Sequence, residues 1–165
     1  MAVAGWRSMA AADLDRVAEI AVIGFPDHFE GRDCFANRLA LNAPGCFVLQ
    51  TADGLEGYLV AYPWAKDAAP RLNTLIDAIP ADASVLYLHD LALTPAVRGQ
   101  GWSNPAVAAV VDLAKGGDWP TVALVAVNDA VDFWRGHGFD VRQTSEMVAK
   151  LASYGSDARY MTRPV

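Results

Sequence analysis

Two periods of hydrophobic residues divide the chain into alternating helices and strands. Within residues 13–25 apolar side chains recur every three or four positions, which predicts a helix with one apolar face. Shorter apolar runs bounded by turn residues predict strands, and Asp53-Gly54 between two such runs is typical of a β-hairpin. Helices are expected over residues 13–25, 32–41, 104–117 and 129–138, and strands over residues 4–9, 46–52, 55–62, 84–93, 121–127 and 158–165. This order indicates a layered α/β fold that contains antiparallel strand pairs.

The segment over residues 63–83 has no regular period, so we expect a long loop with one helical turn around residues 72–79. Long loops within compact domains are often functional lids. We therefore expect this loop to border a binding site.

The composition fits one globular domain over residues 1–165, because 53% of the residues are hydrophobic and 19% are charged. The net charge of −6 provides no basic surface for nucleic acid or for an anionic membrane. No apolar run is long enough to span a membrane and no signal peptide is visible, so we expect a cytoplasmic protein. Cys34 and Cys46 fit neither a metal-ligand spacing nor a disulfide framework, so we expect two buried structural cysteines and no metal.

A glycine-rich turn, Arg98-Gly-Gln-Gly-Trp-Ser103, connects the strand over 84–93 to the helix over 104–117. Glycine is used where the backbone takes a positive φ or comes close to a ligand. The free N–H groups and the dipole of the following helix would attract an anion to this turn. The turn lacks the Gly-Lys-Ser/Thr ending of a P-loop, and Asn104 stands where a dinucleotide-binding motif has its third glycine. A glycine turn that packs on nothing is the alternative to an anion site.

The same turn resembles the Arg/Gln-x-x-Gly-x-Gly/Ala pyrophosphate loop of the GNAT acetyltransferase superfamily. The preceding sequence LHDLALTPAVRG is similar to the fourth strand and turn of that family, and VNDAVDFWRGHGF is similar to its later signature. The chain departs from the family in Ser103, where Gly or Ala is usual, and in Trp134, where many members have tyrosine. The resemblance implies a GNAT-type acyltransferase fold, with a mixed, mostly antiparallel central sheet flanked by helices.

The resemblance also implies a site for acetyl-CoA. The amides of residues 99–103 would hold the pyrophosphate, and Arg98 would add positive charge. The two amides of the pantetheine arm would pair with an exposed strand edge. The expected cofactor-binding residues are Leu91, Ala92, Leu93, Arg98, Gly99, Gln100, Gly101, Trp102, Ser103, Asn128, Phe133 and Trp134. For Phe133, packing in the core is the favoured alternative.

Acyl transfer to an amine needs a base, because a protonated amine is no nucleophile. His89 is the candidate, since some family members place a histidine at this position and an imidazole titrates near neutral pH. Strand alternation would place Tyr87, His89 and Leu91 on one face, and a backbone N–H near Leu91 would stabilise the oxyanion. A structural histidine bonded to a neighbour is the alternative for His89.

The acceptor side is expected at His28 and Glu30, between the first two helices, where the family places acceptor-binding residues. Tyr87 and Asp90 complete the predicted substrate-binding set. Asp90 would point away from the cleft in a regular strand, but a β-bulge would turn it inward, where it could bind a cationic substrate. Tyr154 or solvent would protonate the departing thiolate, because the indole N–H of Trp134 is no useful acid near neutral pH.

We therefore expect an acetyl-CoA-dependent N-acetyltransferase that moves an acetyl group to a primary amine by direct attack. A cysteine nucleophile is not expected, since no histidine is placed by the sequence to activate one. The acceptor is open between a small amine, an amino acid and a peptide terminus, and a homodimer is compatible with the sequence. The alternative is a non-catalytic CoA-binding or regulatory module on the same fold, which would not consume acetyl-CoA when amines are supplied.

Overall fold

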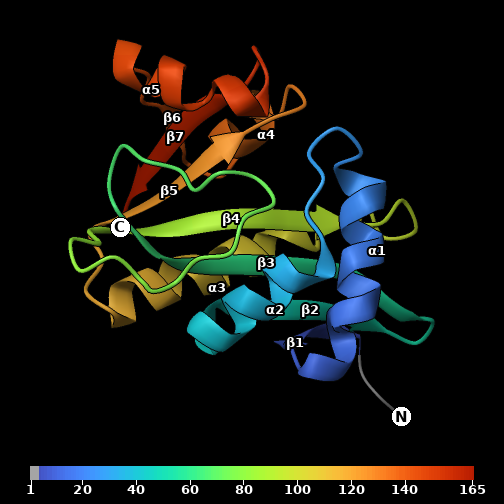
Figure 1. Cartoon of the computed structure of the whole chain (residues 1–165). Helices are drawn as coiled ribbons and strands as arrows, with labels where there is room; N and C mark the ends of the chain where they lie inside the picture. Colours follow the sequence, from blue (N-terminus) through green and yellow to red (C-terminus); the bar gives the residue numbers. More distant parts are fainter. Residues whose placement is uncertain (1–3) are drawn as a thin grey trace.

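A seven-stranded sheet forms the centre of the structure, a computed structural model that describes residues 4–165 (Figure 1). The strand order is β1-β2-β3-β4-β5-β7-β6. The strands are Gly5–Ser8 (β1), Cys46–Thr51 (β2), Gly54–Trp64 (β3), Val85–Leu93 (β4), Thr121–Ala126 (β5), Asp140–Val141 (β6) and Arg159–Pro164 (β7). Neighbouring strands are antiparallel except β4 and β5, which are parallel. The predicted mixed, mostly antiparallel sheet is confirmed.

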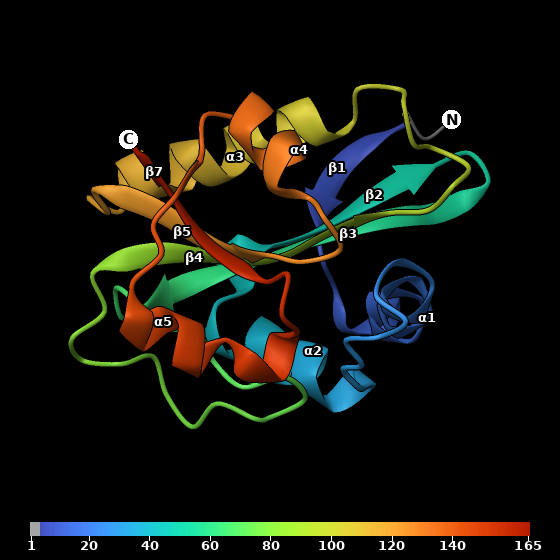
Figure 2. The same ribbon diagram turned by 90° about the horizontal axis from the view of Figure 1, so that it is seen from above.

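Helices cover both faces of the sheet (Figure 2). They are Leu14–Gly24 (α1), Arg32–Leu41 (α2), Ser103–Gly116 (α3), Val131–Gly136 (α4) and Ser145–Lys150 (α5), with 3-10 turns at Ala11–Asp13 (η1), Ala43–Gly45 (η2) and Ala152–Tyr154 (η3). α3 and α4 lie on one face, whereas α1, α2 and α5 lie on the other. None of the helices within residues 4–165 has both the length and the apolar character needed to cross a membrane.

Each face of the sheet has its own hydrophobic core. The core under α3 and α4 consists of aliphatic side chains and a methionine, together with Trp134 and Phe139. The core under α1, α2 and α5 contains in addition the buried tyrosines Tyr58, Tyr62, Tyr87, Tyr154 and Tyr160. Phenolic hydroxyls need hydrogen-bond partners when they are buried. The second core is therefore the one in which polar groups can be held away from water.

Two parts of the chain differ from the sequence prediction. The expected helical turn around residues 72–79 does not form, because the side chain of Asn37 on α2 bonds both the N–H and the carbonyl of Ile76, each at 2.9 Å. These bonds satisfy backbone groups that a helix would otherwise pair. The structure also contains β6 and α5, which the hydrophobic pattern did not indicate. α5 begins at a Thr144 side chain that accepts the Met147 N–H at 3.2 Å, a helix N-cap.

The feature that positions a site is the separation of β4 from β5. These parallel strands pair only at Leu86 with Val122 and at Tyr87 with Ala123. Beyond this point β4 continues beside β3 alone, and β5 continues beside β7. Among the strands of residues 4–165, none therefore lies beside the edge of β4 after Tyr87 on the β5 side.

Candidate active site

A β-bulge in β4 brings two adjacent ionisable side chains to the same face of the sheet. In the pairing of β3 with β4, Val60 lies opposite Asp90 while Ala61 lies opposite Leu88, so His89 is the extra residue. His89 and Asp90 consequently both contact groups of the core under α1 and α2. The alternative that a bulge turns Asp90 inward is confirmed.

The bulge also corrects one expectation of the sequence analysis. Tyr87 belongs to the core under α1 and α2, and His89 follows it there, but Leu91 packs against the core under α3. The predicted common face of Tyr87, His89 and Leu91 is therefore wrong for Leu91. Strand alternation fails at this point because the inserted residue shifts the period by one position.

Glu30 and His89 form a buried ion pair. His89 Nε2 contacts Glu30 Oε1, and each side chain is only 4% exposed. The other imidazole nitrogen, Nδ1, lies 3.4 Å from the hydroxyl of Tyr62, and the second Glu30 oxygen accepts the N–H of Asn73 at 3.2 Å. Burial would lower the pKa of His89, but the carboxylates of Asp90 and Glu30 raise it above its ordinary value. Both ring nitrogens of His89 are thus engaged, and the neighbouring carboxylates favour its protonated form.

Burial acts against ionisation of Glu30 too, but the adjacent His89, the Asn73 N–H and the positive charge of Arg38 bring its pKa below the ordinary value. Arg38 is buried on α2 with 2% of its surface exposed, and its Nη1 donates to the carbonyl of Thr74 at 2.5 Å. Its guanidinium carbon lies 5.8 Å from the ring centre of Tyr62. A second buried cation therefore balances the carboxylates behind the Glu30–His89 pair.

Asp90 is more accessible than Glu30, His89 and Arg38, with 16% of its side chain exposed. One oxygen, Oδ2, accepts the hydroxyl of Tyr58 at 2.9 Å and lies 3.8 Å from His89 Nε2. Burial, together with the negative charge of Glu30, raises the pKa of Asp90 to about 6, although His89 and Tyr58 oppose this shift. Asp90 therefore titrates close to neutral pH.

These groups line a cavity of about 130 Å³ that opens where β4 leaves β5. The cavity is lined by Phe25, His28, Glu30, Leu72, Tyr87, Leu88, His89, Asp90, Leu91, Leu124, Val125, Val127, Ala130, Phe133, Trp134 and Tyr154. The predicted acceptor-side residues His28, Glu30, Tyr87 and Asp90 are thus brought together with His89 and Tyr154. The long loop takes part through Leu72, as expected for a segment that borders a site.

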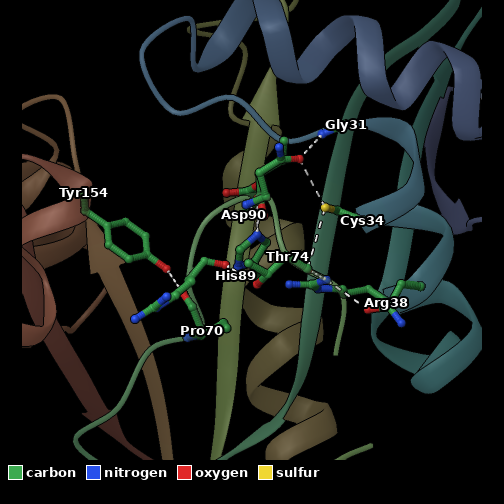
Figure 3. Close-up of polar contacts among 12 residues, drawn as sticks. Gly31, Cys34, Arg38, Pro70, Thr74, His89, Asp90 and Tyr154 are labelled. Atoms are coloured by element: carbon green, nitrogen blue, oxygen red, sulfur yellow. Dashed lines mark hydrogen bonds and ion pairs between the residues drawn. The ribbon is translucent and has the colours of Figure 1, made fainter. Parts of the chain in front are cut away.

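Three segments meet over this cavity: η3, the long loop over residues 63–83 and the segment that contains His28. We call them the roof of the cavity. The Tyr154 hydroxyl of η3 donates to the carbonyl of Pro70 in the long loop, and the His28 ring lies 2.7 Å from the carbonyl oxygen of Tyr154 (Figure 3). The loop is fixed to the start of α2 as well, since Asn73 Oδ1 accepts the Gly31 N–H at 3.0 Å. No local motif marks Asn73, Arg38, Tyr58 or Tyr62, because these residues meet the predicted site residues only in the folded chain.

The glycine turn has the geometry of an anion cradle. Gly99 and Gly101 take φ values of +76° and +84°, and a Cβ at either position would meet no atom within 4 Å. Within residues 4–165, no hydrogen bond uses the N–H groups of residues 99–103 as donors. Free amides at the start of α3 are the groups that bind a pyrophosphate. Arg98 is exposed beside them, and its Nε donates to the Leu93 carbonyl at 2.9 Å.

Of the remaining predicted cofactor residues, Phe133 and Trp134 line the cavity and Asn128 does not. Phe133 is 46% exposed, so the favoured core position for this residue is wrong, and it lines the cavity instead. Trp134 lines the cavity from within the core under α4, where its ring lies 5.5 Å from that of Phe139. Asn128, just after β5, is exposed with a φ of +56° and lies outside the cavity lining. A free strand edge, unpaired amides and an apolar wall together suit a long, amide-containing cofactor with a pyrophosphate.

A metal ion has one candidate position in the described residues. Donor atoms of Glu30, His89 and Asp90 all lie within 4.8 Å of one another. Cys34 and Cys46 are buried, unpaired thiols as expected, and burial raises the pKa of Cys46 to about 12. A thiol with so high a pKa is neither a nucleophile nor a metal ligand near neutral pH.

Residues 13–139 match the family model described as the Acetyltransferase (GNAT) family. The chain belongs to the GNAT family. A comparison with curated protein sequences finds no match. Solved GNAT-fold structures superpose over nearly the whole chain, at identities that establish the fold alone.

Three of these structures illustrate the range. The PaiA N-acetyltransferase from Thermoplasma acidophilum in complex with coenzyme A has a TM-score of 0.70 at 13% identity, over 99% of this chain and 100% of that one. Naa50 from Arabidopsis thaliana with a CoA-peptide bisubstrate analogue has a TM-score of 0.70 at 12% identity, over 98% of this chain and 99% of that one. The GNAT-like decarboxylase GphF in complex with isobutyryl-CoA has a TM-score of 0.76 at 17% identity, over 96% of this chain and 98% of that one. The GNAT fold thus carries more than one reaction, and the site itself must indicate which one applies here.

Proposed function

We propose that this GNAT protein transfers the acetyl group of acetyl-CoA to a primary amine by direct attack, without a covalent enzyme intermediate. The observation that carries the proposal is the cavity at the divergence of β4 and β5, which is lined by the Asp90 carboxyl group and lies beside the part of β4 whose edge is unpaired. A thioester that follows that edge would end beside the carboxyl group. An amine entering the cavity would meet both.

The cofactor side is assigned to the edge of β4 and the turn after it. Leu91, Ala92 and Leu93 offer the backbone that would pair with the pantetheine amides. The free N–H groups of residues 99–103 would hold the pyrophosphate, with Arg98 as a nearby positive charge. Bound CoA would supply the thioester, whose carbonyl carbon is the electrophile. Phe133 and Trp134 would shield the arm from water on its apolar side.

We assign the base to Asp90 in place of His89. An imidazolium whose two nitrogens are engaged cannot accept a proton, and Glu30 holds His89 in that state. Asp90 is ionised just above its pKa of about 6, and among residues 4–165 only Tyr58 donates a hydrogen bond to it. A carboxylate with a pKa near the working pH is an effective general base. Glu30 and His89 would then act as positioning residues for Asp90.

The amine loses two protons in the proposed reaction. Asp90 removes one proton from the ammonium group, and the neutral amine attacks the thioester carbon. A backbone N–H near Leu91 would stabilise the oxyanion until the C–S bond breaks. The second proton of the amine neutralises the thiolate through solvent, because the Tyr154 hydroxyl already donates to Pro70. The products are an amide and free CoA.

Thiol release from acetyl-CoA, measured across a panel of primary amines with mass analysis of the products, tests this function. We expect amine-dependent release and an acetylated amine, with little release when the amine is omitted. The Asp132→Asn variant is the control for Asp90→Asn, since the Asp132 side chain is 97% exposed and is not among those that line the cavity. CoA binding without consumption would support the non-catalytic module instead. Thioester loss that needs no amine would contradict direct amine attack.

A further inference from the structure

The cavity chemistry carries an inference about the acceptor, and this inference rests on the function proposed above. We propose that the acceptor is a compact, singly charged primary amine with an apolar body and no carboxylate. It is neither an amino acid nor a protein terminus. The cavity size, the charges in its lining and the roof over it each point to this class.

The size of the cavity limits the part of the acceptor that enters. Its volume is about 130 Å³, and an apolar protein cavity of about 150 Å³ holds one benzene molecule. The acetyl group must share this space with the amine. By that ratio the cavity holds about five non-hydrogen atoms, so the acetyl group and the buried part of the acceptor together fill it.

The charges of the lining limit the chemistry of the acceptor. Glu30 and Asp90 offer negative charge, and the cavity lining contains neither lysine nor arginine. One ammonium group would be attracted to Asp90 and to the aromatic rings of Tyr87 and Phe133. A carboxylate on the acceptor would be repelled by Glu30 and Asp90, and it would find no free cationic donor in the lining, because both ring nitrogens of His89 are already engaged by Glu30 and Tyr62. A second ammonium would have to be buried against Phe25 and Leu72, where no further carboxylate lies.

The roof limits the length of the acceptor. Tyr154 bonds Pro70, His28 contacts the Tyr154 carbonyl, and the long loop is fixed to α2 through Asn73 and Asn37. A polypeptide acceptor would have to leave the cavity through these contacts while its own amides lost their water. A short amine needs no such exit.

Matched amines test the proposal without turnover. Binding to the CoA-saturated protein is measured by calorimetry for isobutylamine and valine, which differ by one carboxylate, and for butylamine and 1,4-diaminobutane, which differ by one ammonium. We expect isobutylamine and butylamine to bind. Valine, 1,4-diaminobutane and the tripeptide Val-Gly-Gly, which carry additional charge or length, should bind at least tenfold more weakly. Valine or the tripeptide binding as tightly as isobutylamine would overturn the proposal, as would failure of both monoamines to bind.

A variant adds a second readout on the same surface. Leu72 lies half-buried on the loop, so Leu72→Ala should enlarge the cavity without unfolding the protein. We expect this variant to bind phenethylamine more tightly than the unaltered protein does, with CoA affinity unchanged. An unchanged order of amine affinities would contradict the role of cavity size. If a peptide is acetylated while isobutylamine does not bind, the acceptor class is wrong but the proposed acetyl transfer still holds.

Discussion

The two faces of the sheet use burial for different ends. Under α3 and α4 the core is apolar, with Leu59, Val110 and Leu124 almost completely excluded from water. Under α1, α2 and α5 the core holds five tyrosines, and Glu30, Arg38 and His89 are buried beside them. Buried charges seldom add net stability, because desolvation offsets their attraction. The first face therefore stabilises the fold, and the second places charged groups where their pKa values suit proton transfer.

The largest expected effect comes from Asp90→Asn on the polar face. If Asp90 is the base, this change should lower kcat/KM on the order of a hundredfold to ten-thousandfold and remove the loss of rate below about pH 6. Rates measured as a function of pH decide this. A variant that keeps its activity, beside an inactive His89→Gln, would return the base to His89.

The same variant should make the protein more stable at high pH. The fold raises the pKa of Asp90 from 3.8 to about 6, so the stability that the neutral carboxyl provides is lost as the pH rises through about 6. Asparagine mimics the neutral form and can still accept the Tyr58 hydroxyl. We expect a gain of at most about 3 kcal/mol at pH 8 and no gain at pH 4, measured by denaturant unfolding. Lower stability of the variant at pH 8 would contradict the described site.

Leu59→Ala should produce the opposite pattern on the apolar face. Leu59 is fully buried, and truncation of a buried leucine costs about 2–5 kcal/mol of unfolding free energy. The folded fraction should keep the pH dependence of its rate, since the Leu59 side chain belongs to the core on the opposite face of the sheet from Glu30, His89 and Asp90. Denaturant unfolding and a pH–rate profile on the same preparation check both points. A shifted profile would show that the two faces are not independent.

Gly101→Val should change neither core but should weaken cofactor binding. The φ of +84° at Gly101 disfavours a β-branched residue, and the valine side chain would occupy the open space beside the free amides. We expect CoA affinity to fall at least tenfold, about 1.4 kcal/mol, in calorimetry. Arg98→Glu should weaken binding as well, by charge reversal. Unchanged affinity in both variants would remove the anion site from this turn.

Tyr58→Phe should have the smallest effect. Tyr58 lies next to Leu59 on β3, and its side chain points to the opposite face of the sheet. The lost hydroxyl should cost about 1 kcal/mol of stability. Because that hydroxyl lowers the pKa of Asp90, its removal should move the acid limb of the pH–rate profile to higher pH. An unmoved limb, beside a moved limb for Leu59→Ala, would reverse the assignment of the two faces.

The sequence by itself predicted most of the helices and strands and the open geometry of the glycine turn. The α2 bounds match the predicted segment, and the buried residues of α1 follow the predicted apolar period. The geometry of the glycine turn could be predicted because Gly99, Gly101 and the helix after them are adjacent in the sequence, and their backbone conformation depends on neighbouring residues. Local sequence fixes local geometry, so these predictions needed no knowledge of distant contacts.

Only the tertiary structure decided which side chains share the cavity and in which protonation state. His89 and Asp90 face the same core because β4 carries one extra residue opposite β3, a register that no single strand reveals. Glu30 reaches His89 from a loop 59 positions away, and Asn73 and Tyr154 arrive from two further segments. A pKa depends on burial and on neighbouring charges, both of which exist only once these segments have packed together.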